Sequence, residues 1–193
     1  MKNTMLIQRA IQKSLRILNR LLLRINLRKI TWEKIEYFDE VWKERIELMS
    51  KFISTNSDVI DLGCGRMWLK DMVQVKKYYP VDYCYRGIDC IICDFNKYQF
   101  PNIRADVAFV SGALEYIADY NWFIKNIVIY TNRCIISYCI TDEFQDFTAR
   151  KERGWVNNLS KNELIAIFQK NNSHLSEYVR ALNKYHIFIF DKQ

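Results

Sequence analysis

The chain of 193 residues is half hydrophobic and 15% aromatic, which suits one folded domain with a sizeable core and excludes a disordered chain. The net charge of +7 is unevenly placed, because residues 1–32 contain eight Lys and Arg and no acid, whereas the rest of the chain has 21 basic and 22 acidic residues. A nucleic-acid footprint over the whole domain is therefore not indicated, and we expect no nucleic-acid partner. We divide the chain into a basic segment over 1–31 and a globular domain over 32–193.

Basic residues of the N-terminal segment recur at steps of three and four, which places them along one side of a helix. They are Arg9, Lys13, Arg16, Arg20, Arg24 and Arg28, and the other side carries Ile7, Ile11, Leu15, Leu18, Leu22 and Ile25. The basic residues interrupt the apolar run too often for a transmembrane helix or a secretory signal.

We therefore predict an amphipathic helix, and three interpretations of it stay open. Residues 1–30 pack against their own domain or a partner subunit, they lie on an anionic membrane surface, or they are a cleavable organellar presequence. The membrane interpretation would place a cytoplasmic protein peripherally on the inner membrane face.

The predicted elements of the domain begin with a helix over 32–53, which the turn residues of 54–57 close. The elements that follow are a strand over 59–62, a helix over 69–77, strands over 78–81, 90–93 and 107–110, a helix over 120–131 and a strand over 134–140. Strands that alternate with helices imply right-handed crossovers and a mostly parallel sheet with helices on both faces.

The C-terminal part of the chain adds a helix and a hairpin. Ser160 and Glu163 form a capping box that opens a helix over 163–170, and two apolar runs over 178–181 and 186–190 predict a pair of antiparallel strands. The fold class is therefore α/β: a Rossmann-like, mostly parallel, doubly wound sheet with an antiparallel C-terminal hairpin, preceded by N-terminal helices.

Six cysteines lie mostly in or beside apolar runs: Cys64, Cys84, Cys90, Cys93, Cys134 and Cys139. Free cysteine behaves as a small buried hydrophobe, so we expect reduced core residues in a cytosolic protein. The Cys90-x-x-Cys93 spacing also occurs in metal and redox sites, but the chain has no second CxxC and only two histidines. We therefore predict no metal site.

Sheets of this kind bind ligands at the carboxyl ends of their strands. A glycine turn over 63–65 follows the first strand, Asp82 follows the second, and Asp94 with Phe95 follows the third. A carboxylate after the second strand can accept both hydroxyls of a ribose, and one after the third can accept from an adenine amino group while the aromatic ring packs on the base. Each acid alone suits an ordinary turn, but together, in this order, they favour an adenosine-type ligand.

The residues after the glycine turn distinguish between such ligands. A pyrophosphate cofactor usually needs GxGxxG, and here the bulky Trp68 stands at the third position, which disfavours a nucleotide-sugar or dinucleotide enzyme. The chain has no GKS or GKT, so a P-loop is excluded. S-adenosylmethionine, which has adenine and ribose but no phosphates, fits better.

DVIDLGCG over 58–65 resembles the first motif of class I S-adenosylmethionine-dependent methyltransferases. The resemblance extends through PVDY over 80–83, CDFN over 93–96 and DVAFVSGALEYIAD over 106–119, and it covers about residues 40–190. The overall pattern looks most like small methyltransferase-like proteins from bacterial surface-polysaccharide gene clusters. The resemblance implies S-adenosyl-L-methionine as the cofactor and a small-molecule or saccharide acceptor.

The same resemblance implies a set of cofactor-binding residues: Asp61, Gly63, Cys64, Gly65, Asp82, Tyr83, Asp94, Phe95, Ser111 and Gly112. Asp61, Gly63 and Gly65 would line the methionine moiety, and Asp82 would hold the ribose. Asp94 and Phe95 would contact adenine, and the residues at 111–112 would border the transfer site. Two positions depart from the family pattern. Met67 stands where many members have a third glycine, and Tyr116 stands where many have histidine.

Methyl transfer is an in-line displacement in which the protein supplies alignment, and a hydroxyl acceptor benefits from a general base. Candidate polar residues near the strand ends are Glu115, Tyr116, Asp119, Tyr138, Asp142, Glu143 and His174. We predict Glu115 and Tyr116 as catalytic, since they follow the fourth strand, although Tyr116 also suits packing over the cofactor. His174, at the end of a predicted helix, suits a surface or capping role, and His186 suits a structural one.

The longest polar insert, over 141–158, follows the last parallel strand, where such folds often place acceptor contacts. Arg150, Arg153 and Trp155 would hold an anionic, sugar-bearing substrate, or the insert is a solvated loop held by its tryptophan. Two functions stay open: a methyltransferase acting on a saccharide or other small hydroxyl acceptor, and a non-catalytic methyltransferase-like interaction subunit that keeps the fold.

Overall fold

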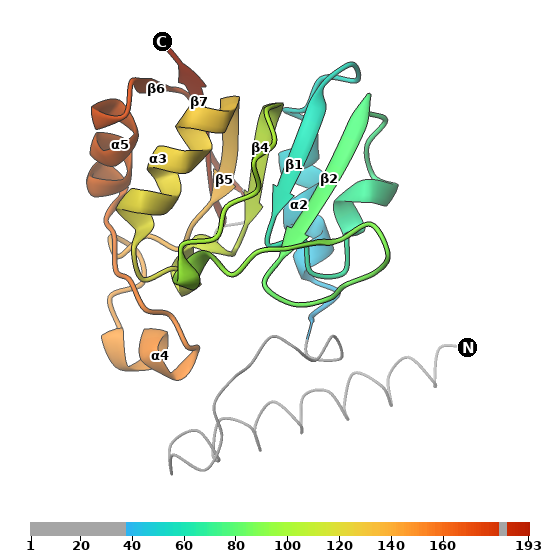
Figure 1. Ribbon diagram of the computed structural model, residues 1–193. Helices are drawn as coiled ribbons and strands as arrows, with labels where there is room; N and C mark the ends of the chain where they lie inside the picture. The colour runs from blue at the N-terminus through green and yellow to red at the C-terminus, as the bar shows by residue number, and fades with distance from the viewer. Residues whose placement is uncertain (1–37, 182–184) are drawn as a thin grey trace.

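The computed structural model describes residues 38–181 and 185–193, which form a three-layer α/β domain (Figure 1). Its strands are β1 (Asp58–Leu62), β2 (Lys77–Asp82), β3 (Ile91–Ile92), β4 (Ala105–Ser111), β5 (Thr131–Ser137), β6 (Ser173–Ala181) and β7 (Tyr185–Lys192). Its helices are α2 (Trp42–Ser50), α3 (Tyr120–Tyr130), α4 (Phe147–Glu152) and α5 (Lys161–Lys170), with 3₁₀ turns η2 (Trp68–Asp71), η3 (Phe95–Lys97) and η4 (Leu114–Tyr116). The basic segment over 1–31 and its predicted helix lie outside the described residues.

The strands form one sheet in the order β3-β2-β1-β4-β5-β7-β6. The pairs β1–β2, β2–β3, β1–β4 and β4–β5 are parallel, whereas β7 lies antiparallel between β5 and β6. The chain order reverses between β1 and β4, which is the switch point where α/β sheets of this kind bind ligands. The predicted fold class, including the antiparallel C-terminal pair, is confirmed.

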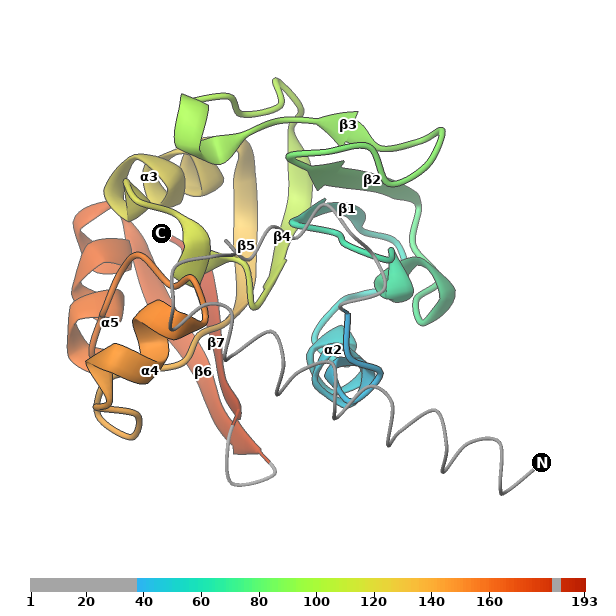
Figure 2. The same ribbon diagram turned by 90° about the horizontal axis from the view of Figure 1, so that it is seen from below.

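Successive residues along each central strand face opposite sides of the sheet, because the side-chain period of a strand is two. One face buries Ile60, Ala108, Val110, Ile136, Phe188 and Phe190, and the other buries Val59, Val107, Phe109, Ile135, Ile187 and Ile189. Helices α3 and α5 cover the first face, and α2 covers the second (Figure 2). Burial on both faces explains why these strands are continuous apolar runs in the sequence.

Both helices on the first face begin with side-chain caps. Asp119 Oδ1 accepts a hydrogen bond from the Trp122 N–H (3.0 Å) at the start of α3. At the start of α5, Ser160 Oγ accepts from the Glu163 N–H (3.2 Å) while Glu163 Oε2 accepts from the Ser160 N–H (2.7 Å), which confirms the predicted capping box. Caps of this kind stabilise a helix by about 1 kcal/mol each.

The predicted helix over 69–77 is wrong. The chain makes one 3₁₀ turn at η2 and β2 already begins at Lys77. Met67, just before η2, has a left-handed backbone (φ +54°), which a continuing α-helix does not allow. The Lys76 N–H donates to the Ser57 carbonyl (3.0 Å), which draws the end of this connection back to the start of β1. The apolar residues of this connection have the spacing of a helix in the sequence, but they pack on the second face of the sheet without forming one.

Other boundaries also differ from prediction. Of the predicted helix over 32–53, the described part is helical only from Trp42 to Ser50, and residues 32–37 lie outside the described range. The predicted strand over 90–93 is only two residues long, and that over 134–140 runs from Thr131 to Ser137. His174 lies within β6, paired opposite Asp191, and not at a helix end. No helix in the described residues is both long and apolar enough to cross a membrane.

Candidate active site

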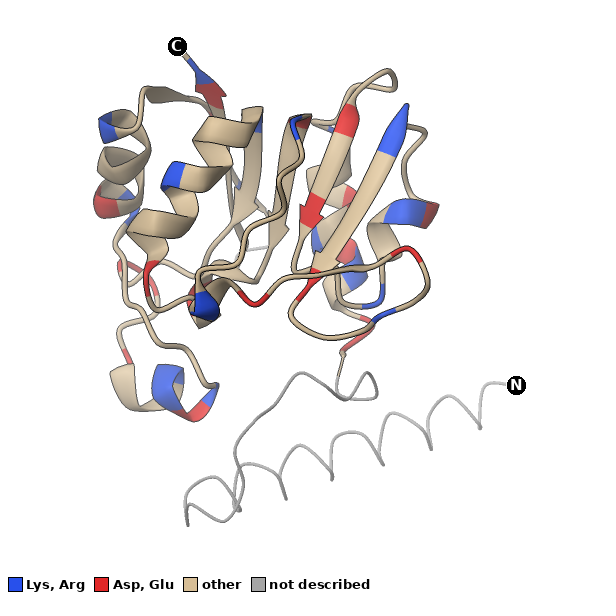
Figure 3. Cartoon of the chain, in the orientation of Figure 1, with Lys and Arg blue, Asp and Glu red and all other residues tan. Residues whose placement is uncertain are grey.

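A cavity of about 610 Å³ opens beside the carboxyl ends of the parallel strands. It is lined by Phe38, Trp42, Arg45, Gly63, Asp82, Tyr83, Arg86, Asp94, Phe95, Asn96, Ser111, Gly112, Ala113, Glu115, Tyr116, Ile117, Arg153 and Trp155. Acidic residues mark the lower ends of β1 and β2 in Figure 3, and α4 carries basic residues below the sheet on the same side. The structure therefore brings together most of the predicted site residues, with three exceptions: Asp61, Cys64 and Gly65 are not on the cavity wall.

The glycine turn is held against β2 by its backbone. The N–H groups of Gly63 and Cys64 both donate to the Val81 carbonyl (2.8 and 3.0 Å). Gly63 has φ +86°, and a Cβ at this position would lie 2.7 Å from the Ala113 Cβ. A side chain at Gly63 is excluded both by backbone strain and by this contact. The turn therefore presents bare backbone to the cavity.

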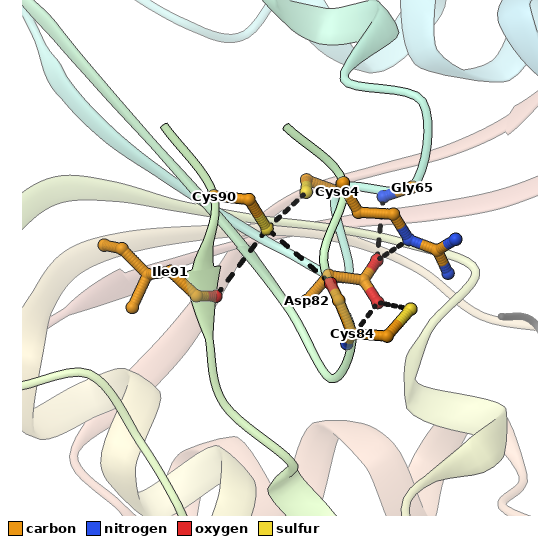
Figure 4. A network of polar contacts seen from close by, with 7 residues as sticks. Cys64, Gly65, Asp82, Cys84, Cys90 and Ile91 are labelled. Carbon is orange, nitrogen blue, oxygen red and sulfur yellow. Dashed lines mark hydrogen bonds and ion pairs between the residues drawn. The ribbon is translucent and has the colours of Figure 1, made fainter. Parts of the chain in front are cut away.

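Asp82, at the end of β2, is the centre of a polar network (Figure 4). Its Oδ2 accepts from the Gly65 N–H (3.0 Å) and pairs with Arg86 Nε (3.2 Å), and both side chains of this ion pair are almost fully buried. Its Oδ1 makes longer contacts to Cys84, 3.4 Å from N and 3.7 Å from Sγ. A carboxylate has about four lone-pair positions, so Oδ1 keeps acceptor capacity for hydroxyl groups in the cavity.

Asp94 follows β3 and caps η3. Its Oδ1 accepts from the Asn96 N–H (3.1 Å) and its Oδ2 pairs with Lys97 (3.2 Å). Phe95 lines the cavity but is 8% exposed, and its ring packs against Phe123 with centroids 4.8 Å apart. The Phe95 ring belongs to the core of the first face, and the contact of Asp94 and Phe95 with adenine stays a prediction.

Asn96 was not among the predicted residues, and it joins two parts of the cavity wall. Its Nδ2 donates to the Tyr116 carbonyl (2.9 Å) and its Oδ1 accepts from the Ala118 N–H (2.8 Å). These two bonds fix η3 against the turn that carries Glu115.

Arg45 of α2 was also missed, and it reaches the carboxyl end of β4. Its Nε donates to Ser111 Oγ (3.0 Å) and its Nη2 to the Ser111 carbonyl (3.4 Å). A Cβ on Gly112 would lie 2.6 Å from Nη2, so the glycine makes room for the guanidinium. Arg45 lies three positions after Trp42 and four before Met49, on the apolar side of its helix. A positively charged residue on the apolar side of a helix is the feature of the sequence that could have indicated a role for Arg45 in the site.

Glu115 has an oxygen without a hydrogen-bond partner among the described residues. It is 4% exposed, its Oε1 accepts from the Cys139 N–H (3.0 Å), and its Oε2 is buried with no hydrogen bond. Burial raises the pKa of Glu115 above its ordinary value, although Arg45 and Arg150 favour the charged form. An unpaired buried carboxylate oxygen is costly, and this one belongs to a residue on the cavity wall.

Tyr116, the second predicted catalytic residue, lies beside the insert over 141–158. Its hydroxyl accepts from Trp155 Nε1 (3.1 Å), and the Val156 N–H donates to the Glu115 carbonyl (2.8 Å). The insert is therefore joined to the turn after β4. The hydroxyl of Tyr116 is already used by the indole, which supports the packing interpretation more than proton transfer.

The prediction that Arg150 contacts substrate is wrong. Its side chain is 1% exposed and does not line the cavity. Its guanidinium donates to Asn158 Oδ1 (2.6 Å), the Cys139 carbonyl (2.8 Å) and the Tyr138 hydroxyl (3.1 Å). Arg150 therefore organises the insert from within, whereas Arg153 and Trp155 do face the cavity.

Asp61 lies under the glycine turn and accepts a short hydrogen bond from the Tyr78 hydroxyl (2.5 Å). Burial raises the pKa of Asp61 to about 7, the Tyr78 hydrogen bond opposes this shift, and the nearby Asp82 carboxylate adds to it. Asp61 is buried and does not line the cavity, so its predicted contact with a methionine moiety stays a prediction.

All six cysteines are free thiols. The Sγ atoms of Cys64 and Cys90 are 3.9 Å apart (Figure 4), and burial raises the pKa of both thiols. Within residues 38–181 and 185–193, no three or more His, Cys, Asp or Glu side chains form a group that could hold a metal ion.

His186 is buried, as its predicted structural role requires. Its Nδ1 is 2.8 Å from the Tyr178 hydroxyl and its Nε2 is 3.2 Å from Glu143 Oε2. It joins β6 and β7 to the insert and lies outside the cavity wall.

No protein-family model and no curated protein sequence matches the chain. Its fold matches solved methyltransferase structures. One acts in calicheamicin biosynthesis and holds S-adenosylhomocysteine (TM-score 0.61, 13% identity, 79% of this chain and 54% of that chain). Another is the 1,6-didemethyltoxoflavin-N1-methyltransferase of Burkholderia thailandensis, also with S-adenosylhomocysteine (TM-score 0.60, 15% identity, 80% of this chain and 80% of that chain). A third is a mitomycin 7-O-methyltransferase (TM-score 0.64, 14% identity, 82% of this chain and 56% of that chain).

The chain therefore has the fold of S-adenosylmethionine-dependent methyltransferases, as the motif over 58–65 predicted. It spans about half the length of the calicheamicin and mitomycin enzymes, with 54% and 56% of each covered. The narrower resemblance to proteins of polysaccharide gene clusters stays a prediction.

Proposed function

We propose that this chain is an S-adenosylmethionine-dependent methyltransferase that acts on a small acceptor through a hydroxyl group, with Glu115 as the proton acceptor. The observation that carries this proposal is Glu115, which lines the cavity and whose buried Oε2 has no partner among the described residues. The opposite wall of that cavity has the bare glycine backbone and the strand-end carboxylates that suit an adenosine-type ligand.

The residues present fit the cofactor by their chemistry. Asp82 Oδ1 has acceptor capacity for ribose hydroxyls, and Asp94 ends the neighbouring strand, where a carboxylate can accept from an adenine amino group. Gly63 lines the cavity with backbone and has no side chain. Arg45, bonded to Ser111 at the end of β4, supplies a guanidinium that would pair with the carboxylate of the amino-acid end.

When bound, the cofactor would supply an electrophilic methyl group for in-line displacement by the acceptor oxygen, in which the O–C bond forms as the S–C bond breaks and S-adenosylhomocysteine is the leaving group. Glu115 Oε2 takes the hydroxyl proton as the new bond forms. The raised pKa of Glu115 makes this carboxylate a stronger base than an exposed one. The Cys139 N–H, bonded to Oε1, holds the carboxylate in position.

Calorimetry on the full chain tests the cofactor part of the proposal. We expect S-adenosylmethionine and S-adenosylhomocysteine to bind, and NAD not to bind. Asp82→Ala should weaken S-adenosylhomocysteine binding by about 1.5–3 kcal/mol, roughly 10-fold to 150-fold, because charge-assisted hydrogen bonds are lost. Asp71→Ala, on the exposed side of η2 and away from the cavity, should leave the affinity unchanged. Folded protein that binds neither methionine-derived ligand would refute the proposal.

A non-catalytic interaction subunit would bind the cofactor without turnover. Nothing in that function requires a buried carboxylate with a free oxygen beside the cavity, so the catalytic interpretation accounts for more of the structure. Release of S-adenosylhomocysteine with a suitable hydroxyl acceptor distinguishes the two functions.

A further inference from the structure

Arg153 is a cation on the cavity wall that no acid among the described residues neutralises. It follows the last turn of α4, where its Nη1 donates to the Ala149 carbonyl (2.9 Å). Its guanidinium lies over the rings of Phe144 (4.7 Å) and Trp155 (5.6 Å). The remaining N–H groups of a half-buried guanidinium are thus available to a ligand.

Trp155 gives this cation a rigid aromatic neighbour. Its indole N–H donates to the Tyr116 hydroxyl (3.1 Å), Phe144 meets its ring edge-on with centroids 5.9 Å apart, and the buried Arg150 guanidinium lies 4.9 Å from its ring centroid. A side chain held from three directions loses little conformational entropy when a ligand packs on it. The tryptophan on the cavity wall is therefore preorganised.

The cation and the flat ring adjoin the proposed proton acceptor. The Val156 N–H donates to the Glu115 carbonyl (2.8 Å), so the segment of chain that carries Trp155 runs directly beside Glu115. All three residues, Glu115, Arg153 and Trp155, line the same cavity. One small ligand can therefore contact a base, a cation and an aromatic plane together.

Most of the other polar groups of the cavity would hold the cofactor or are already paired. Asp82 and Arg45 would hold the ribose and the amino-acid end, and Asn96 is bonded to the backbone around Tyr116. A sugar ring would bring several hydroxyls that these groups would leave unmatched, and each buried unmatched hydroxyl is unfavourable. A planar ring with one anionic group and one hydroxyl needs only the three side chains that are available.

We propose that Arg153 and Trp155 form the acceptor's anion subsite, and that the acceptor is a small hydroxylated aromatic carboxylic acid. The carboxylate pairs with the planar Arg153 guanidinium, the ring packs on Trp155, and the hydroxyl faces Glu115. This inference rests on the proposed methyltransferase function.

The test is calorimetry on the full chain, first with S-adenosylhomocysteine and then, with that ligand saturating, with salicylate and 4-hydroxybenzoate and their carboxamides. We expect at least one acid to bind about 10-fold more tightly than its carboxamide, because a charge-assisted pair replaces a neutral hydrogen bond. Arg153→Gln should abolish this preference and keep the affinity for S-adenosylhomocysteine. Lys151→Gln, an exposed neighbour on α4 outside the cavity, should change neither.

Equal binding of acid and carboxamide, no binding of either acid, or a preference that survives Arg153→Gln would overturn the anion subsite while S-adenosylhomocysteine still binds. Failure of S-adenosylhomocysteine itself to bind would overturn the proposed function, and the subsite with it. The two failures are therefore distinguishable in one series of titrations.

Discussion

The two walls of the cavity are built in different ways. The cofactor wall, which we define as Gly63, Asp82, Asp94, Ser111 and Gly112, comes from residues at or just after the ends of four parallel strands. The acceptor wall, defined as Glu115, Tyr116, Arg153 and Trp155, comes from η4 and from an insert some forty residues further along.

The topology of the sheet positions the cofactor wall, since parallel strands end at one edge. A network of buried side chains positions the acceptor wall, with Arg150 bonded to Tyr138, Cys139 and Asn158 inside the insert. Changes on the cofactor wall should therefore alter binding, and Asp82→Ala should also lower stability, because it breaks the buried ion pair with Arg86. Changes beneath the acceptor wall should alter stability as well.

Glu115→Gln should have the largest effect on the reaction. Loss of the general base should lower kcat by about 10²–10⁴-fold, measured as S-adenosylhomocysteine release, while the affinity for S-adenosylhomocysteine stays unchanged. Wild-type kcat should rise with pH through the raised pKa of Glu115, because only the deprotonated carboxylate accepts the proton.

Glu44→Gln, on the exposed side of α2, is the matched control and should keep wild-type kcat. A Glu115→Gln protein that keeps its rate, or that loses cofactor affinity to the same extent as its rate, would contradict the separation of the two walls.

Arg150→Met should have the largest effect on stability. It leaves buried acceptors without donors, at about 1–3 kcal/mol for each group, so we expect the free energy of unfolding to fall by roughly 3 kcal/mol. Urea denaturation measures this change. Lys151→Met, exposed on the same helix, should stay within about 0.5 kcal/mol of wild type. A loss below about 1 kcal/mol for Arg150→Met would mean that the insert does not depend on this network.

Asp61→Asn should have its smallest effect at about pH 4, where the amide replaces a protonated carboxyl of similar shape, and its effect should be seen in the pH dependence of stability. Because folding raises the pKa of Asp61 to about 7, the folded state binds the proton more tightly than the unfolded state. The stability from this group is present below about pH 4, the ordinary pKa of an aspartate, and is lost as the pH rises to about 7. Asp61→Asn should flatten that decline in urea unfolding, and Asp71→Asn should not. If Asp61→Asn leaves the slope of stability against pH unchanged, Asp61 is not the group that binds this proton.

The predictions that were confirmed depend on local patterns. The apolar runs of β1 and β4, the capping box of Ser160 and Glu163, and the antiparallel pairing of β6 and β7 all follow from neighbouring residues. The helix over 69–77 failed because the chain makes only the 3₁₀ turn η2 before β2 begins at Lys77, and the apolar residues between them pack on the sheet without helical geometry. Periodicity alone does not distinguish these two arrangements.

In the candidate site, too, the residues that follow local patterns were predicted and the others were missed. Gly63, Asp82 and Asp94 each follow a predicted strand, so the order of strands along the chain was enough to predict that they converge. Arg86, which pairs with Asp82, comes from a loop with no pattern.

Arg150 and Arg153 lie three residues apart in one charged insert, yet one is buried and the other faces the cavity. The sequence by itself determined the sheet and the glycine turn with its strand-end acids, because strand period and backbone conformation are local. Only the tertiary structure decided which arginine faces the cavity and which oxygen of Glu115 is left without a partner among the described residues. Burial and hydrogen-bond pairing depend on residues far apart in the chain.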